Sequence, residues 1–196
     1  MNSPVPSDAC QIENEDGRLD ALYRYEILDS APEESFDRII RLAKVSLQVP
    51  IAYVAFIDRD RQWFKSREGI SSQETPRKSS FCTYTIQGVT PLMVPDTTLD
   101  ERFSDSSLVT ESPFIRFYMG VPLRTPDGFN IGTLCVADTK PRHASPEQVA
   151  VLADLARLVV DELELRGPRS DGQPDGSPDA AFLHGRGNTQ SGTRAA

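Results

Sequence analysis

Apolar and polar residues alternate most regularly between residues 114 and 138, and this pattern predicts two long antiparallel strands joined by a tight turn. Every second position of the first strand is apolar, the period of two that a strand with two different faces requires. Residues 126–128, Pro-Asp-Gly, favour the turn, because proline presets its first dihedral angle and glycine accepts the left-handed position that closes it. We expect the rest of the chain to pack around this hairpin.

The turn also sets the predicted register of the hairpin, because a fixed loop length determines which residues face each other. Counting outward places Met119 opposite Cys135 on an apolar face that helices should cover. Arg116 is expected to form a cross-strand ion pair with Asp138. The other face carries a mixture that suits a ligand cavity better than a core: Arg116, Tyr118, Gly120, Leu134, Val136 and Asp138.

Helical periodicity predicts three helices. A short amphipathic helix begins at Arg18, and a capping box at residues 30–33, Ser-Ala-Pro-Glu, opens a second helix that ends near Leu47. Another capping box at residues 145–148, Ser-Pro-Glu-Gln, opens a helix that ends at Arg166. Apolar positions extend around more than one stripe of this last helix, so we expect it to contact a partner helix as well as the sheet.

Shorter elements are predicted between the second helix and the hairpin. A nearly all-apolar run indicates a strand covered on both faces, and a segment isolated by Pro76 and Gly88 is interpreted as a short helix. The expected elements are strands at 51–57, 62–67 and 92–94, a short helix at 81–86, and a polar helix or loop at 100–112.

Composition limits the chain to one folded domain with tails. It has 196 residues, 38% of them hydrophobic, and the polar segments 1–17 and 167–196 are expected to be a disordered N-terminal arm and a disordered C-terminal tail around a domain at 18–166. The net charge of −8 argues against nucleic acid as a partner. Because no apolar run approaches a membrane span and the N-terminus lacks a basic start, we expect a cytoplasmic protein with no membrane contact.

Few residues offer reactive chemistry. The three cysteines, Cys10, Cys82 and Cys135, have neither the spacing of a disulfide framework nor that of a metal site, so no metal site is predicted. Cys82 is interpreted first as a small buried hydrophobe, with a functional thiol as the alternative. Neither His143 nor His184 is placed to ligate haem, and we predict no catalytic residues.

Four motifs, in this order, resemble the GAF domain family over residues 18–166: VPIAYVAFIDRDRQWFKSREG, SFCTYTI, LMVPDTTLDERF and IRFYMGVPLRTPDGFNIGTLCVAD. The chain is most similar to sensory GAF domains found ahead of histidine kinase or diguanylate cyclase domains. The resemblance implies an α+β fold with a PAS-like, six-stranded antiparallel sheet, helices on one face and a loop-covered pocket on the other. It also implies a homodimer through the terminal helices. Thr83 follows Cys82, where bilin-attaching members commonly have histidine, so a chromophore is not expected.

We therefore expect a stand-alone sensory and regulatory module that is not an enzyme. In this hypothesis it binds a small-molecule ligand and signals through a helical dimer interface to a separate partner, such as a histidine kinase or a diguanylate cyclase. The alternatives are a thiol enzyme resembling GAF-type methionine sulfoxide reductase and a ligand-free dimeric adaptor. No cofactor is identified. The candidate ligand-binding residues are Trp63, Phe81, Cys82, Asp96, Arg116, Tyr118, Leu134 and Val136.

Overall fold

The computed structural model describes residue 12 and residues 14–166, which form an α+β domain built on one six-stranded antiparallel sheet. The strand order is β3-β2-β1-β6-β5-β4. The strands are β1 Ile51–Ile57, β2 Arg61–Glu68, β3 Glu74–Pro76, β4 Leu92–Val94, β5 Phe117–Arg124 and β6 Asn130–Asp138. The predicted disordered segments fall largely outside the described residues.

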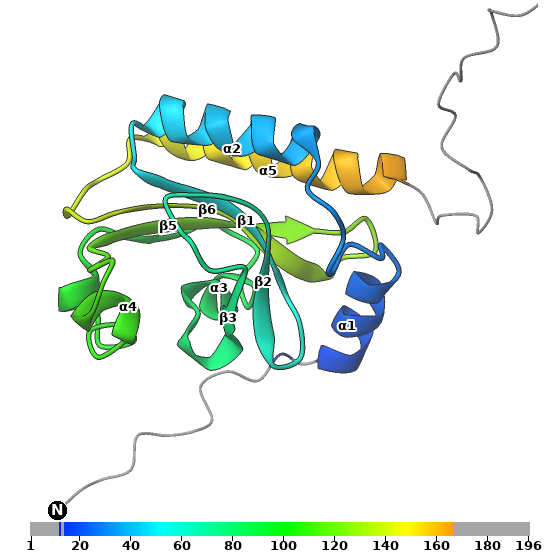
Figure 1. Ribbon diagram of the computed structural model, residues 1–196, viewed down its shortest axis with the longest axis horizontal. Helices are drawn as coiled ribbons and strands as arrows, with labels where there is room; N and C mark the ends of the chain where they lie inside the picture. The colour runs from blue at the N-terminus through cyan, green and yellow to red at the C-terminus, as the bar shows by residue number, and fades with distance from the viewer. Residues whose placement is uncertain (1–11, 13, 167–196) are drawn as a thin grey trace, which may run out of the picture.

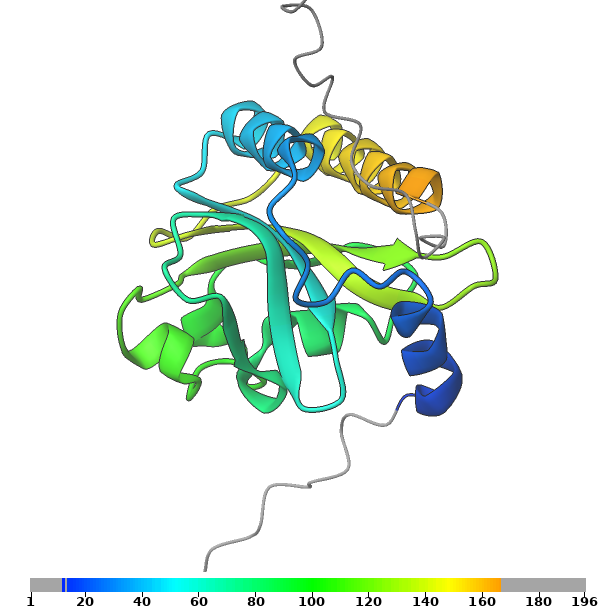
Figure 2. The same ribbon diagram turned by 45° about the vertical axis from the view of Figure 1, so that its right-hand side comes forward.

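Two long helices, α2 (Glu34–Leu47) and α5 (Pro146–Arg166), lie side by side over one face of the sheet (Figures 1 and 2). The predicted apolar stripe of α2 is the buried one: Phe36, Ile39, Ile40, Ala43 and Leu47. A third helix, α1 (Glu15–Tyr23), packs at one end of the sheet. It begins three residues before the predicted start, so residues 15–17, expected in the disordered arm, are helical.

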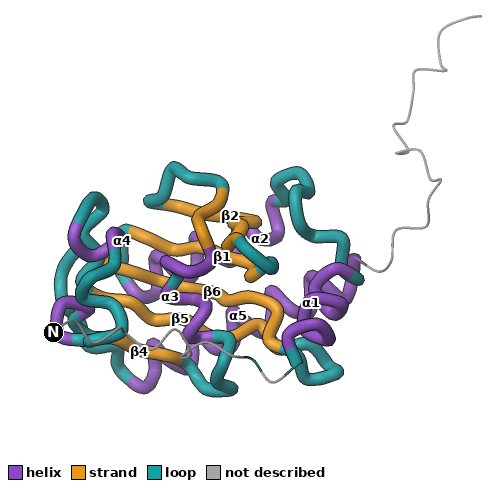
Figure 3. The backbone as a smooth tube through the Cα atoms, turned by 90° about the horizontal axis from the view of Figure 1, so that it is seen from below, coloured by secondary structure: helices purple, strands orange, loops and turns teal. Residues whose placement is uncertain are grey.

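Short elements and loops cover the opposite face of the sheet (Figure 3). They include α3 (Phe81–Thr85), α4 (Ser107–Thr110) and the 3-10 turns Arg77–Ser79 and Thr97–Leu99. The predicted short helix at 81–86 is confirmed, since the Ser80 hydroxyl caps α3 by accepting from the backbone N–H of Cys82. All seven residues of β1 are buried, as its apolar run predicts for a strand covered on both faces.

The predicted hairpin forms, but its register is wrong by one residue over most of its length. The turn is as expected, with Thr125 donating its backbone N–H to the Phe129 carbonyl. A β-bulge then inserts Ile131, so that Arg124 faces Asn130 while Leu123 faces Gly132. Because side chains alternate across a strand, one extra residue sends every later β6 side chain to the opposite face.

One of the two predicted capping boxes is confirmed and the other is wrong. At α5 the Ser145 hydroxyl accepts from the Gln148 N–H, and the Gln148 side chain accepts from the Ser145 N–H. At α2 the predicted residues instead hold a buried lysine. Lys65 donates its ammonium to Ser30 at 2.8 Å and to Glu33 at 2.7 Å. A buried ammonium needs such partners, and this requirement outweighs the local helix cap.

Candidate functional site

Two cysteines meet on the loop-covered face of the sheet. Cys82 lies on α3 and Cys135 on β6, and their sulfur atoms are 3.5 Å apart, in van der Waals contact. Both side chains are fully buried and both are free thiols. The Tyr118 hydroxyl lies 3.2 Å from the Cys135 sulfur and 3.5 Å from the Cys82 sulfur. We call these three residues, with Tyr53 and Thr133, the thiol cluster.

The two thiols have different acidities. Burial acts to raise the pKa of Cys82, but hydrogen bonds from Cys135, Thr133 and the two tyrosines outweigh it and lower that pKa to about 7. Burial raises the pKa of Cys135 well above its ordinary value, and the neighbouring Cys82 adds to the effect. Once Cys82 has lost its proton, its negative charge opposes ionisation of the neighbouring Cys135. Cys82 is therefore the acidic thiol of the pair.

Local packing fixes the position of each group in the thiol cluster. Tyr118 lies beside Gly120, and its hydroxyl bonds the Thr85 hydroxyl on α3 at 2.7 Å. A Cβ on Gly120 would lie 2.2 Å from the Tyr118 hydroxyl oxygen, so the glycine leaves the space that the phenol fills. The ring of Phe81 contacts that of Tyr118 edge-on, with centroids 5.2 Å apart. The hydroxyl and thiol groups of the cluster are therefore closely packed and surrounded by apolar side chains.

Cys135 lies on the face of the sheet opposite to the one predicted from the sequence. It was expected opposite Met119 under the helices, but the bulge turns it toward Cys82 and pairs it with Gly120. The available signal was Gly132, since a glycine inside a strand pattern marks a bulge or a close backbone approach. A Cβ at Gly132 would lie 2.3 Å from the Ala55 carbonyl oxygen, so that approach is real.

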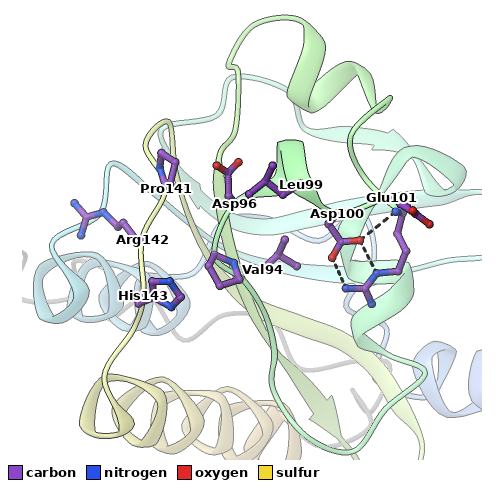
Figure 4. Close-up of a pocket in the computed structure, with 10 residues that line it drawn as sticks. Val94, Asp96, Leu99, Asp100, Glu101, Pro141, Arg142 and His143 are labelled. Carbon is purple, nitrogen blue, oxygen red and sulfur yellow. Dashed lines mark hydrogen bonds and ion pairs between the residues drawn. The ribbon is translucent and has the colours of Figure 1, made fainter.

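An open pocket with a volume of about 960 Å³ lies at the edge of the sheet beside β4 (Figure 4). Its chemistry is mixed, with acidic side chains on one side and Arg142 and His143 on the other. The lining residues are Val94, Pro95, Asp96, Leu99, Asp100, Glu101, Arg102, Pro141, Arg142 and His143. Hydrogen bonds from the Thr98 hydroxyl and N–H lower the pKa of Asp96, so its carboxylate is charged at neutral pH.

The eight candidate ligand-binding residues divide among several places. Phe81, Cys82 and Tyr118 come together on the loop-covered face, and Asp96 lines the open pocket. The others predicted for that face, Trp63, Leu134 and Val136, are buried in the core beneath α2 and α5. The bulge explains why Leu134 and Val136 lie on the helix-covered face, since it pairs them with Val121 and Met119.

Arg116 lies near the open pocket but binds differently from the prediction. Its guanidinium donates to the backbone carbonyls of Val109 and Ile115 at 2.9 and 3.0 Å. The expected ion pair with Asp138 is wrong, because Asp138 pairs with Arg142 at 2.5 Å. The Arg116 backbone N–H still donates to the Asp138 backbone carbonyl at 2.8 Å, so the two residues are joined through their backbones and not through their side chains.

Within residue 12 and residues 14–166, no group of three or more His, Cys, Asp or Glu side chains is placed to hold a metal ion. Also within those residues, no helix has both the length and the apolar content needed to cross a membrane.

The sheet order, the paired helices on one face and the short helices on the other define a GAF fold, and the chain belongs to the GAF domain family, whose model matches residues 31–163. Solved structures share this fold. The GAF domain of an Acinetobacter phosphoenolpyruvate-protein phosphotransferase is 18% identical, with a TM-score of 0.56 over 76% of this chain and 94% of that one. A type II free methionine-R-sulfoxide reductase from Thermoplasma acidophilum is 14% identical, with a TM-score of 0.57 over 68% and 93%.

A curated relative has a higher sequence identity to this chain than these two structures. Over 166 residues the chain is 40% identical to cyclic di-GMP phosphodiesterase PA2567 of Pseudomonas aeruginosa. The match covers 84% of this chain but 28% of that protein, so the chain spans a little over a quarter of its relative's length. This comparison contradicts the prediction that the chain is not an enzyme, because the relative is named as a phosphodiesterase.

Proposed function

We propose that this chain is a sensory GAF domain that binds a small molecule and thereby controls the hydrolysis of cyclic di-GMP. The observation that carries the proposal is the 40% identity to a cyclic di-GMP phosphodiesterase across 84% of the chain. Identity at this level supports a shared role for the matched segment. A histidine kinase or diguanylate cyclase partner, expected from the family resemblance, is the alternative output.

The proposed ligand site is the open pocket beside β4. A pocket of this volume suits a small organic ligand, and it offers charged groups of both signs. Asp96 supplies a carboxylate. Arg116 does not line the pocket, but its backbone carbonyl accepts from the N–H of Thr97, the residue after Asp96, at 2.7 Å. Phe81, Cys82 and Tyr118 form the packed layer beneath the loops. Ligand binding at Asp96 would therefore act on the loops that hold this layer.

The proposed output surface is the outer side of α2 and α5, where we place a homodimer interface. Apolar side chains are exposed there on both helices: Leu42, Val45, Val151, Leu158 and Leu165. The three on α5 are spaced by seven residues, the repeat with which helices pair along a seam. Dimers are the commonest closed assembly, and a shift of paired helices is a direct way to pass a signal onward.

A chimera tests the proposed control of phosphodiesterase activity. Residues 12–166 of this chain replace the matching segment of PA2567, and hydrolysis of cyclic di-GMP to the linear dinucleotide is followed by chromatography. We expect the chimera to retain hydrolysis and to respond to Asp96→Asn, which removes the carboxylate charge in the pocket. As a matched control, Asp105→Asn changes an exposed carboxylate of the neighbouring loop that does not line the pocket.

Two results would contradict the proposal. One is hydrolysis that is insensitive to replacement of the segment by an unrelated folded domain, since the segment would then have no controlling role. The other is hydrolysis by the isolated 196-residue chain at the rate of the chimera, which would place the reaction in this domain itself.

A second candidate function, a thiol enzyme of the methionine sulfoxide reductase type, is favoured by one observation. The structure brings Cys82 and Cys135 into contact, whereas the sequence prediction had separated them. Thiol-dependent reduction of methionine sulfoxide that disappears in Cys82→Ser would support this candidate. Unchanged turnover in that variant, or none in the parent chain, would eliminate it.

A further inference from the structure

A second cavity, of about 390 Å³, lies at the end of the domain where α1, the segment after α3 and the β5–β6 turn meet. It shares no residue with the open pocket beside β4. Its lining consists of Ile12, Asn14, Arg18, Ile86, Gln87, Val89, Arg124, Gly128, Phe129 and Asn130.

Arg18 lines this cavity with one of its three side-chain nitrogens unused. Its side chain is 1% exposed, and Glu15 binds two of its three nitrogens, with Nε to oxygen at 2.9 Å and Nη2 to oxygen at 2.7 Å. This bidentate contact fixes the plane of the guanidinium. Nη1 is buried and has no hydrogen-bond partner among the described residues. A buried cationic N–H without an acceptor is unfavourable, because it has lost water and gained nothing.

Asn130 lines the same cavity with an acceptor unused. Its residue exposure is 9%, and its side-chain nitrogen donates to the carbonyls of Ile86 at 2.9 Å and Gly88 at 2.7 Å. Two carbonyl partners identify that atom as the nitrogen, so the other terminal atom is the amide oxygen. This oxygen is buried and, within the part of the chain described, has no partner.

These two atoms are unusual in the domain. Only three buried side-chain polar atoms of the described residues lack a hydrogen-bond partner, and the third, Nε of Arg67, does not line this cavity. Folded proteins pair nearly all such atoms, and an exception calls for an explanation such as an unseen ligand. Because the two residues that carry these atoms line the same cavity, one small ligand held there could supply both missing partners.

The other lining residues indicate the ligand's charge and shape. Among the described residues that line the cavity there are two arginines, Arg18 and Arg124, and no carboxylate. The Arg124 guanidinium lies across Gly128, since a Cβ on that glycine would be 3.1 Å from its Nη2 atom. Ile86, Val89 and Phe129 supply an apolar flank. An anionic group beside the arginines and an apolar body fit this lining.

We propose that this cavity binds a small carboxylate that also carries an N–H donor, of which an apolar α-amino acid is the simplest example. The carboxylate accepts from the unused nitrogen of Arg18 and from Arg124, and the ammonium group donates to the amide oxygen of Asn130. The apolar side chain lies against Phe129. This site is separate from the open pocket and its occupancy does not depend on the proposed phosphodiesterase control.

Isothermal titration calorimetry of the full 196-residue chain tests the proposal. The probes are L-valine, L-leucine and L-phenylalanine, and two matched compounds each lack one group of leucine: 4-methylpentanoate has no ammonium, and 3-methylbutylamine has no carboxylate. Inorganic phosphate tests for a simple anion site. We expect at least one amino acid to bind, and each matched compound to bind at least about tenfold more weakly, because one buried partner is left unpaired.

Variants locate the bound probe. Arg18→Gln removes the unused donor but also the Glu15 contact, and so it is liable to disturb the fold. Arg124→Gln changes an exposed side chain, and we expect it to weaken amino-acid binding about tenfold while leaving the melting temperature unchanged. The matched control is Arg24→Gln, an exposed arginine that pairs with Asp127 on the same turn without lining the cavity.

Three results would overturn the proposal. The first is no heat from any of the amino acids. The second is binding of phosphate with no binding of an amino acid, which would make the site one for inorganic anions. The third is amino-acid binding that Arg124→Gln and Arg24→Gln weaken equally or not at all, which would place the probe elsewhere on the chain.

Discussion

Replacing Gly120 by alanine is expected to displace Tyr118 from the thiol cluster and so to destabilise the domain. Gly120 lies in the middle of β5, opposite Cys135, and its backbone is not in the left-handed region. Alanine is therefore acceptable to the backbone, and the effect comes from contact alone. The new methyl group would lie 2.2 Å from the Tyr118 hydroxyl oxygen and 3.0 Å from the Thr85 hydroxyl oxygen. Tyr118 must move away from the strand.

The magnitude follows from the two interactions that the movement affects. Inserting a methyl group into a well-packed core costs about 1–3 kcal/mol through forced side-chain shifts. Breaking the hydrogen bond between Tyr118 and Thr85 costs about 1 kcal/mol more. The sum is about 2–4 kcal/mol, and for a domain of this size it lowers the melting temperature by about 4–16 °C.

The measurement is urea unfolding at neutral pH, with the melting temperature as a second readout. Gly88→Ala is the matched control, because its Cβ would have no neighbour closer than 3.9 Å. We expect that control to change the free energy of unfolding by no more than about 0.5 kcal/mol. A Gly120→Ala variant as stable as Gly88→Ala would show that Tyr118 has free space beside it, and the packing argument for the cluster would fail.

Three further predictions test other parts of the structure. Gly128→Val should destabilise the domain by about 1–2 kcal/mol in urea unfolding, because Gly128 has a φ of 94° that a β-branched residue cannot readily adopt; an unchanged midpoint would contradict this turn geometry. Burial acts to raise the pKa of Glu15, but its hydrogen bonds to two arginines lower it from 4.5 to about 2. Its stabilisation is therefore present above pH 4.5 and lost as the pH falls toward 2, and Glu15→Gln should remove about 2–3 kcal/mol at pH 7 and flatten that acid limb. Asp16→Asn should leave both unchanged, and an identical acid limb in the two variants would refute the assignment. The double variant Val151→Glu and Leu158→Glu should sediment as a folded monomer, whereas a parent chain that is monomeric at tens of micromolar would exclude the dimer.

Sequence patterns predicted the elements of this fold better than the contacts between them. The strands at 51–57 and 92–94 and the helix end at Leu47 depend on local periodicity and end signals, and the structure confirms them. The ion pair between Arg116 and Asp138 depended on register along a whole strand. A single bulge residue, Ile131, was enough to make it wrong.

The candidate site was only partly predictable for a related reason. Cys82 was identified from its own motif, but the residue that gives it chemical context, Cys135, reaches it only through the bulge. Likewise, Ser30 and Glu33 have the spacing of a helix cap, and sequence alone does not reveal that Lys65, which follows them by 35 and 32 residues, will be buried beside them. A local signal such as a helix cap competes with long-range interactions such as the pairing of a buried charge. The interaction whose loss would cost more free energy determines the structure.

The short helix α3 connects the thiol cluster with the second cavity. A five-residue helix is not stable in isolation, so its position depends on its tertiary contacts. Cys82 and Thr85 fix it to the cluster through the Cys135 sulfur and the Tyr118 hydroxyl, and the carbonyl of Ile86, its C-cap, is fixed by Asn130. Because Asn130 begins the strand that carries Cys135, a change at the cavity can reach the cluster both through α3 and along β6. We therefore infer that a displacement of Ile86 or of Asn130 would also alter the contacts between α3 and the thiol cluster.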